Sequence, residues 1–233
     1  MLIEKNDNGI YSVRISLDGN EFEHNQMRGN RNSFKNAVNA ITLLKNKDLN
    51  PEIFFVPTKK NKHCLPFIMD FGKNIGVKVN VRRFMPYGRG AENTTLLLSS
   101  EDVADLFHVY EKHYYGNSTF DKCYTIAEKR GNCKLCIQST AAINIDGNVF
   151  SCPFFQEKKF CLGNINDNSL KDILDNLHTS PLMSITDDQL SSKCQKCDIF
   201  SLCRGGCRGS AYILSGGDIY SDDPQCAYQL TKY

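Results

Sequence analysis

The sequence predicts an α/β protein in which a parallel sheet with its helices is followed by a small part rich in cysteine. Strand-like and helix-like stretches alternate in the first half, which is typical of parallel strands joined by helices. All but one of the 11 cysteines lie in the second half. The composition changes near Asp121, where cysteine, glycine and short turns become frequent. We therefore expect two domains, 1–118 and 119–233.

Three strand–helix pairs are expected in the first domain. Each strand alternates apolar and polar side chains, and each helix has apolar residues at helical spacing. The strands are Gly9–Leu17, Glu52–Val56 and Val77–Val81, and the helices begin at Ser33, cover Lys62–Gly76 and cover Ser100–Tyr115. We expect Ser33 and Ser100 to cap their helices and Gly76 to end one. Three parallel strands make an incomplete sheet, so we also expect an exposed parallel edge.

The second domain should contain a hairpin and a short helix. Apolar stretches on both sides of the turn Asp146-Gly147-Asn148 predict two antiparallel strands within Ala141–Cys152. The segment Ser169–Leu177 has apolar side chains at helical spacing. Both elements are short, so this domain should have little apolar core.

Seven of the cysteines follow a spacing that is typical of metal sites. Two of them frame C-x10-G-x4-C, four form the run C-x2-C-x5-C-x3-C, and one follows this run. The seven are Cys136, Cys152, Cys194, Cys197, Cys203, Cys207 and Cys226. Thiolates bind iron–sulfur clusters or zinc, and the spacing leaves both alternatives open. A disulfide framework is disfavoured, because the number of cysteines is odd and the segment MLIEKNDNGI does not resemble a signal peptide.

Charge and hydropathy disfavour nucleic acid and membranes as partners. The formal net charge is +2, from 28 basic and 26 acidic residues, whereas nucleic-acid binding needs a concentrated basic surface. No apolar stretch approaches the roughly 20 residues that cross a bilayer. We expect a cytoplasmic protein, because the cytoplasm keeps thiols reduced.

The cysteine spacing resembles the SPASM domain, which follows the barrel in many radical SAM peptide-modifying enzymes. The segment LGNI at Leu162–Ile165 is similar to that family as well. The first domain resembles the second half of a radical SAM barrel in VRISLDG, MRGNRNSF and RRFMPYGRG, which begin at Val13, Met27 and Arg82. The resemblance covers almost the whole chain. It implies a partial, second-half radical SAM β/α barrel followed by a small SPASM iron–sulfur domain.

The resemblance also implies two auxiliary 4Fe–4S clusters. Their ligands would be Cys136, Cys152 and Cys207 for the first cluster, and Cys194, Cys197, Cys203 and Cys226 for the second. The first cluster then needs a fourth ligand. Cys133 is the nearest candidate, with Cys123 behind it, and an iron site left open for substrate is the alternative.

Two residues of the first domain match positions that contact S-adenosylmethionine in related enzymes. Ser16 would bind the ribose and Arg28 the carboxylate, to which a guanidinium offers a forked donor. Without the resemblance, Ser16 would be a strand-end serine bonded to a nearby turn. Arg28 would be a solvated charge or part of a helix-start salt bridge. His24 is expected to be a lone histidine in a polar loop.

One motif of the family does not occur in this sequence. Radical SAM enzymes cleave S-adenosylmethionine at a cluster held by C-x3-C-x2-C, and both this triplet and the glycine-rich segment that grips the methionyl amine are absent. Catalysis is therefore left open, and S-adenosylmethionine is expected only if the other half of the barrel is supplied. In sulfatase maturases an aspartate follows the second cysteine of the first motif. Pro153 stands at that place here, which disfavours that reaction.

The leading hypothesis is the C-terminal part of a radical SAM/SPASM enzyme that modifies a peptide or protein. Its clusters would bind the substrate or accept an electron. The expected partners are that substrate, a separate N-terminal half of the enzyme and an electron donor such as flavodoxin or ferredoxin. One alternative is a non-catalytic iron–sulfur subunit for electron transfer or substrate binding. A zinc-stabilised interaction module is the other alternative.

Overall fold

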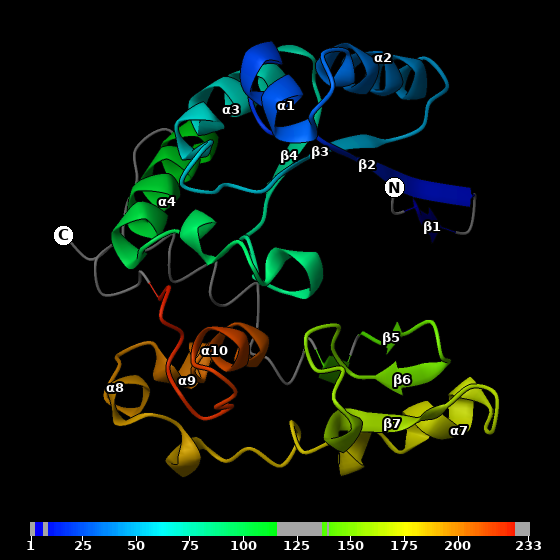
Figure 1. The fold of residues 1–233 in the computed structure, drawn as a ribbon, viewed down its shortest axis with the longest axis vertical. Coiled ribbons are helices and arrows are strands. Elements are labelled where there is room, and N and C mark those ends of the chain that lie inside the picture. The colour runs from blue at the N-terminus through cyan, green and yellow to red at the C-terminus, as the bar shows by residue number, and fades with distance from the viewer. Residues whose placement is uncertain (1–2, 7–8, 116–136, 139, 227–233) are drawn as a thin grey trace. The chain divides into compact units, whose positions relative to one another are not determined.

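The computed structural model describes residues 3–6, 9–115, 137–138 and 140–226 (Figure 1). These residues form two compact units. The described residues of unit 1 are those up to Phe84 and those from Glu92 to Tyr115. Unit 2 takes in Met85–Ala91 and the described residues from Ile137 to Cys226. The expected boundary between 118 and 119 lies outside the described residues and stays a prediction.

The sheet of unit 1 has four strands in the order β1-β2-β3-β4 (Figure 1). They are β1 (Ile3–Asn6), β2 (Gly9–Ser16), β3 (Pro51–Phe55) and β4 (Lys78–Val81). The three predicted strands pair in parallel, with Ile15 opposite Ile53 and Ile53 opposite Val79. The sequence did not predict β1, which pairs antiparallel with β2. We expected an exposed parallel edge without assigning it to a strand, and β1 covers much of the outer edge of β2.

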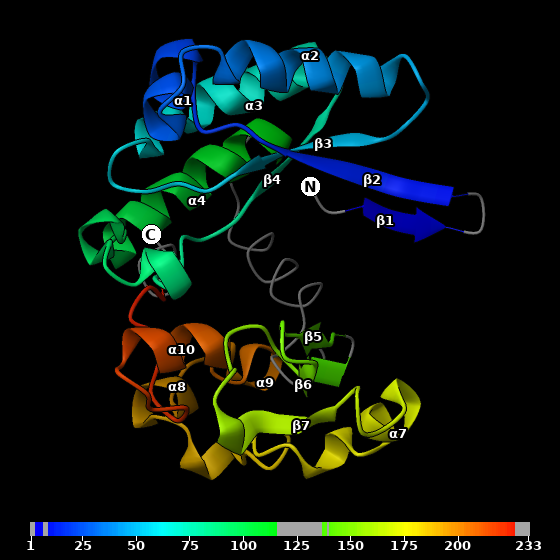
Figure 2. The same ribbon diagram turned by 45° about the vertical axis from the view of Figure 1, so that its right-hand side comes forward.

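Four α-helices follow the strands of unit 1. They are α1 (Glu21–Arg28), α2 (Ser33–Lys45), α3 (Leu65–Asn74) and α4 (Ser100–Tyr115), with 3-10 turns η1 (Lys62–Cys64), η2 (Gly88–Gly90) and η3 (Thr94–Leu96). Helices α2 and α3 pack against the strands, and α4 packs beside α3 (Figures 1 and 2). Gly76 follows α3 with a φ of 62°, as expected of a residue that ends a helix.

The predicted caps of two helices were each wrong by one residue. Ser33 is the first residue of α2, and Asn32 precedes it as the cap position. Ser99, not Ser100, caps α4: its Oγ accepts a hydrogen bond from the Asp102 amide at 3.2 Å, and Asp102 accepts one from the Ser99 amide. This reciprocal pair is a capping box in which an aspartate replaces the usual glutamate or glutamine, and it satisfies two backbone amides.

The core of unit 1 lies between the sheet and its helices. Strand β3 shows the cause, because Ile53 and Phe55 point into the core while Glu52 and Phe54 point to the opposite face. The buried residues of this core are Leu17, Ile41, Ile53, Phe55, Cys64, Leu65, Ile68, Met69, Val77 and Val79. On β3, the side chains opposite the helices are therefore polar or aromatic.

Unit 2 contains a three-stranded antiparallel sheet and short helices (Figure 2). The strands are β5 (Ala142–Ile143), β6 (Asn148–Phe150) and β7 (Cys161–Asn164); the helices are α7 (Leu170–Asp175), α8 (Ser192–Gln195), α9 (Phe200–Cys203) and α10 (Arg208–Leu214); the 3-10 turns are η4 (Lys158–Phe160), η5 (Leu177–Thr179) and η6 (Asp187–Gln189). The predicted hairpin is confirmed as β5 and β6, with Gly147 at a φ of 83° in its turn. Ser169 caps α7, and β7 is a strand that the sequence did not predict.

The core of unit 2 combines four aromatic side chains with aliphatic ones. It comprises Ile137, Phe150, Cys152, Phe155, Phe160, Leu182, Ile185, Leu190 and Tyr212. The rings of Phe155 and Phe160 lie 4.8 Å apart in an edge-to-face arrangement, and Tyr212 packs on both. Within the described part of the chain, no helix is long and apolar enough to cross a membrane.

Candidate functional site

Three further cysteines, Cys194, Cys197 and Cys226, lie near enough to Cys203 in unit 2 to affect its pKa. Burial, and after it the negative charges of Cys226, Cys194 and Cys197 as thiolates, raise the pKa of Cys203 to about 11. Charges shift a pKa in this way only when they lie within several ångströms of the group. These are the four residues that the family resemblance assigns to one cluster. Four cysteines placed in this way match the ligand set of a bound iron–sulfur cluster.

Hydrogen bonds hold the segment ahead of Cys226 against α8, the helix that carries the first cysteine of the four. The Ser191 amide donates to the Tyr220 carbonyl at 3.1 Å. The Lys193 Nζ atom donates to the Asp222 carboxylate at 3.0 Å. These contacts explain how a cysteine so far along the chain reaches the group.

A left-handed turn separates Cys203 from the next cysteine. Arg204, Gly205 and Gly206 have φ values of 44°, 78° and 71°. The Gly206 amide donates to the Cys203 carbonyl at 3.0 Å and also to the Cys203 sulfur, which lowers the pKa of that thiol against the larger upward effect of burial. Two successive glycines are needed here, because residues with a side chain rarely adopt these backbone angles.

Arg208 fastens this turn to the C-terminal segment. Its guanidinium is buried, and the Nη1 atom donates to the carbonyls of Ile219 at 3.1 Å and Ser221 at 2.7 Å. Its Nη2 atom donates to the Gly205 carbonyl. The sequence analysis missed Arg208, because an arginine next to a cysteine run does not by itself indicate three buried carbonyl partners.

The remaining predicted metal ligands are only partly described. Cys152 is 9% exposed and belongs to the apolar core of unit 2. Cys207 precedes α10 as its cap residue. Cys133 and Cys136 lie outside the described residues. None of the eight described cysteines forms a disulfide.

Ser16 lies at the carboxyl end of β2, on the sheet face opposite the helices. Its neighbour Leu17 is buried in the core, so alternation directs Ser16 away from that core. It pairs with Phe54 of β3. Guanidinium groups of Arg14 and Arg82 each lie 6.0 Å from the centre of the Phe54 ring. Ligands of parallel sheets bind at this end of the strands.

Glu52 anchors the polar groups on the same face. Its Oε2 atom accepts hydrogen bonds from Asn80 at 2.8 Å and Arg14 at 3.3 Å, and its Oε1 atom lies 3.4 Å from the Lys78 Nζ atom. Charged side chains from three adjacent strands are thus fixed in one network. This network keeps the face polar without leaving a buried charge unpaired.

Arg28 lies at the end of α1, where its guanidinium is bound by Asp18. The two Asp18 oxygens accept hydrogen bonds at 2.6 Å and 3.0 Å. Burial alone would raise the pKa of Asp18, but hydrogen bonds from His24 and Arg28 and the Arg28 charge outweigh it and lower the pKa below its ordinary value. Of the two roles open to Arg28 without the resemblance, the salt bridge is present, although it lies at the end of a helix.

His24 was wrongly predicted to lie in a polar loop. It lies in α1 and is 2% exposed. Its Nδ1 atom is 3.0 Å from the Asp18 amide nitrogen and 3.1 Å from the Asp18 Oδ2 atom. A neutral ring serves one of them at a time, either accepting from the amide or donating to the carboxylate. The sequence did not predict this helix, because EFEHNQMR has no apolar side chains repeating at helical spacing.

Comparison with known proteins supports an iron–sulfur domain within unit 2. A family model described as an iron–sulfur cluster-binding domain, SPASM, matches residues 133–198. The mycofactocin maturase MftC of Mycolicibacterium smegmatis is 29% identical over 224 residues, which cover 92% of this chain and 56% of that protein. These matches identify residues 133–198 as a SPASM domain and support the resemblance of the chain to radical SAM/SPASM enzymes. The chain spans about half the length of the mycofactocin maturases that it matches.

Two further comparisons concern this family. A cysteine-type anaerobic sulfatase-maturating enzyme of Clostridium perfringens is 33% identical over 66 residues, 28% of this chain and 18% of that protein. The solved structure of native anSMEcpe with bound AdoMet has a TM-score of 0.67 at 21% identity and covers 95% of this chain and 65% of its own. The fold expected from the resemblance, a partial radical SAM β/α barrel followed by a SPASM domain, is confirmed.

Proposed function

We propose that this chain is the part of a radical SAM/SPASM enzyme that holds two auxiliary 4Fe–4S clusters and takes part in modifying a peptide or protein. The observation that carries the proposal is the group of four sulfurs around Cys203. A purely structural cysteine would need no such neighbours. Four thiolates match the usual ligand set of a 4Fe–4S cluster.

The two clusters use interleaved ligands. Cys194, Cys197, Cys203 and Cys226 hold one, and Cys136, Cys152 and Cys207, with Cys133 as the fourth, hold the other. When bound, the clusters supply sites that accept an electron or bind a substrate group. The protein contributes the Gly206 amide at the Cys203 sulfur and the turn that Arg208 holds, and hydrogen bonds of this kind tune a cluster's potential.

In unit 1, Ser16 and Arg28 bind S-adenosylmethionine once the other half of the barrel is supplied. Arg28 is oriented by Asp18, so one edge of its guanidinium is occupied and the remaining amino group stays available for a carboxylate. Ser16 presents its hydroxyl on the polar sheet face. Cluster chemistry with S-adenosylmethionine belongs to the half that carries C-x3-C-x2-C.

A peptide is the favoured substrate class. Relatives include maturases of mycofactocin and of the sporulation killing factor of Bacillus subtilis, and anSMEcpe has been solved with AdoMet and the Kp18Cys peptide. Pro153 disfavours the sulfatase-type reaction. We place the protein in the cytoplasm, where its thiols stay reduced and a flavodoxin or ferredoxin can supply electrons.

Metal analysis tests this proposal. The full chain, reconstituted without oxygen, is expected to contain about eight irons and eight sulfides. Cys203→Ala should reduce both to about four, whereas the control Cys161→Ala, outside both ligand sets, should keep about eight. Mössbauer spectra of the unmodified chain test the same point if the variant does not fold. Zinc without sulfide would overturn the proposal in favour of a zinc-stabilised module.

The non-catalytic iron–sulfur subunit is a second candidate that the same group of cysteines supports. Both candidates use the same clusters. They differ in whether S-adenosylmethionine is cleaved when a polypeptide with the missing motif is present. Formation of 5′-deoxyadenosine that depends on both chains supports the enzyme, and formation independent of this chain supports the subunit.

A further inference from the structure

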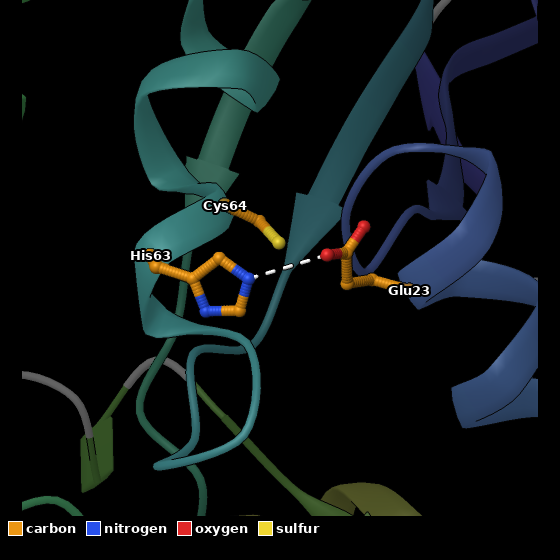
Figure 3. A group of neighbouring side chains, drawn as sticks. All are labelled: Glu23, His63 and Cys64. Atoms are coloured by element: carbon orange, nitrogen blue, oxygen red, sulfur yellow. Dashed lines mark hydrogen bonds and ion pairs between the residues drawn. The ribbon is translucent and has the colours of Figure 1, made fainter.

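Glu23, His63 and Cys64 form a cluster of potential metal ligands in unit 1 (Figure 3). Each offers one ligand atom, and the three atoms lie within 4.8 Å of one another. The His63 Nε2 atom is 3.3 Å from the Glu23 Oε1 atom, and Figure 3 shows the Cys64 sulfur directed to the same place. These residues belong to α1 and η1 of unit 1.

The backbone around this cluster is fixed before any ligand binds. Asn20 caps α1 by accepting hydrogen bonds from the amides of Phe22 and Glu23, at 2.9 Å and 3.3 Å. Gly19 leaves no room for a side chain, because a Cβ atom there would lie 2.8 Å from the Cys64 sulfur. The loop after β2 therefore approaches η1 closely, and only glycine permits this approach.

A buried asparagine joins the two loops that carry the ligands. Asn61 is 1% exposed, and its side-chain amide donates to the Asp18 carbonyl at 2.9 Å. Its Oδ1 atom accepts from the amide and the hydroxyl of Thr58, at 2.7 Å and 2.8 Å. The ends of β2 and β3 are thus cross-linked, and the ligand residues that follow each strand keep their spacing.

Two polar groups at the cluster are arranged as for a metal ligand. The Glu23 Oε2 atom is buried and has no hydrogen-bond partner. Leaving such an oxygen without a partner costs free energy, and a bound cation would remove that cost. Burial and the charge of Glu23 raise the pKa of the neighbouring Cys64 thiol despite the opposing effect of the Asn20 amide, and a bound cation would favour the thiolate.

We propose that Glu23, His63 and Cys64 bind a zinc-class divalent cation, with water as the fourth ligand. A thiolate, an imidazole and a carboxylate form a borderline-soft set that suits zinc and does not suit calcium or magnesium. A tetrahedral zinc ion holds nitrogen and oxygen ligands about 3.4 Å apart, close to the separation of His63 and Glu23. The ion joins α1 to η1 and does not depend on the iron–sulfur clusters.

Zinc binding by the full chain, with its iron–sulfur clusters loaded, tests the proposal. After zinc chloride is added and excess removed, we expect one zinc per chain. Zinc K-edge absorption should show one sulfur with nitrogen and oxygen neighbours. His63→Ala should weaken binding by at least about tenfold, since loss of outer partners alone costs about 10–100-fold. His63 is exposed, so this variant is expected to fold.

The matched control is His178→Ala, which removes an exposed histidine from unit 2 and should leave zinc binding unchanged. Cys64→Ala provides a second variant and should remove the sulfur from the zinc shell. Absence of retained zinc would show that Glu23 and His63 form an ion pair only, and the proposal would fail. A zinc shell of four sulfurs that His63→Ala does not change would also overturn it. Zinc would then occupy the cluster cysteines, and this result would contradict the proposed function as well.

Discussion

Asp18 shows how one buried side chain can organise a loop. Its carboxylate binds Arg28 at two atoms and lies beside His24, while its carbonyl accepts a hydrogen bond from Asn61. The residue is 5% exposed, so its charge depends on these neighbours for compensation. Asp18 therefore connects the end of β2 with helix α1 and with the loop after β3.

Asp18→Asn is expected to lower the free energy of unfolding by about 1–2 kcal/mol, because the charged hydrogen bonds to Arg28 are lost. The effect stays below that of a fully buried pair, since the Arg28 side chain is 43% exposed. Urea denaturation of the cluster-loaded chain, followed by circular dichroism, measures it. Asp105→Asn, at an exposed position of α4, is the control and should change little.

This destabilisation should not shrink between about pH 8 and pH 5. The pKa of Asp18 lies below its ordinary value of 3.8, because the effects of His24 and Arg28 outweigh that of burial. A carboxyl group of this kind stabilises the fold above its unfolded-state pKa and loses that contribution only as the pH falls through the folded-state pKa. A smaller difference at pH 5 would contradict the lowered pKa.

At the scale of elements, the turn after α9 depends on Arg208. Its three carbonyl partners belong to two segments, Gly205 on one side and Ile219 and Ser221 on the other. The helices that carry the cysteines here, α8 and α9, have four residues each. Helices of this length are not stable alone, so tertiary hydrogen bonds must position their sulfurs.

Arg208→Gln is expected to speed the release of iron to an anaerobic chelator by about tenfold, as is typical when outer partners of metal ligands are lost. The decay of visible absorbance measures this release. Arg204→Gln is the control, because Arg204 lies in the same turn but is exposed. Equal rates in the two variants would show that Arg208 does not hold the ligands in place.

The elements that the sequence predicted are those with strong periodicity. The three parallel strands, α3 with Gly76 and the hairpin at Gly147 all follow from alternation and turn chemistry. Helix α1 and strand β7 could not be predicted this way, because polar residues dominate α1 and β7 is held by pairing with β6. The site divides in the same manner: spacing indicates the cysteines, whereas the roles of Asp18 and Arg208 depend on hydrogen-bond partners that follow no sequence pattern.

At the scale of the whole molecule, the two units differ in what stabilises them. Unit 1 has a layered core of aliphatic side chains between sheet and helices. Unit 2 has strands of two to four residues and helices of four to seven residues around its aromatic core. Metal binding commonly supplies the folding free energy that such small units lack.

Removal of iron should therefore unfold unit 2 and leave unit 1 folded. Hydrogen–deuterium exchange of the chain, with and without its clusters, measures this by segment. Amides of β7 and α10 are expected to lose protection, while those of β3 and α3 keep it. Equal loss in both units would show that they fold as one cooperative body.

Strand β1 has a consequence for any partner that completes the sheet. It occupies the outer backbone groups of β2 along Gly9–Val13, and β3 occupies the other edge of β2. A further parallel strand could reach β2 only by displacing β1. Strand β1 would thus compete with the incoming strand for that edge of β2. Completion of the barrel from this side would be a strand exchange, whose speed is limited by the opening of β1 once the partner is abundant.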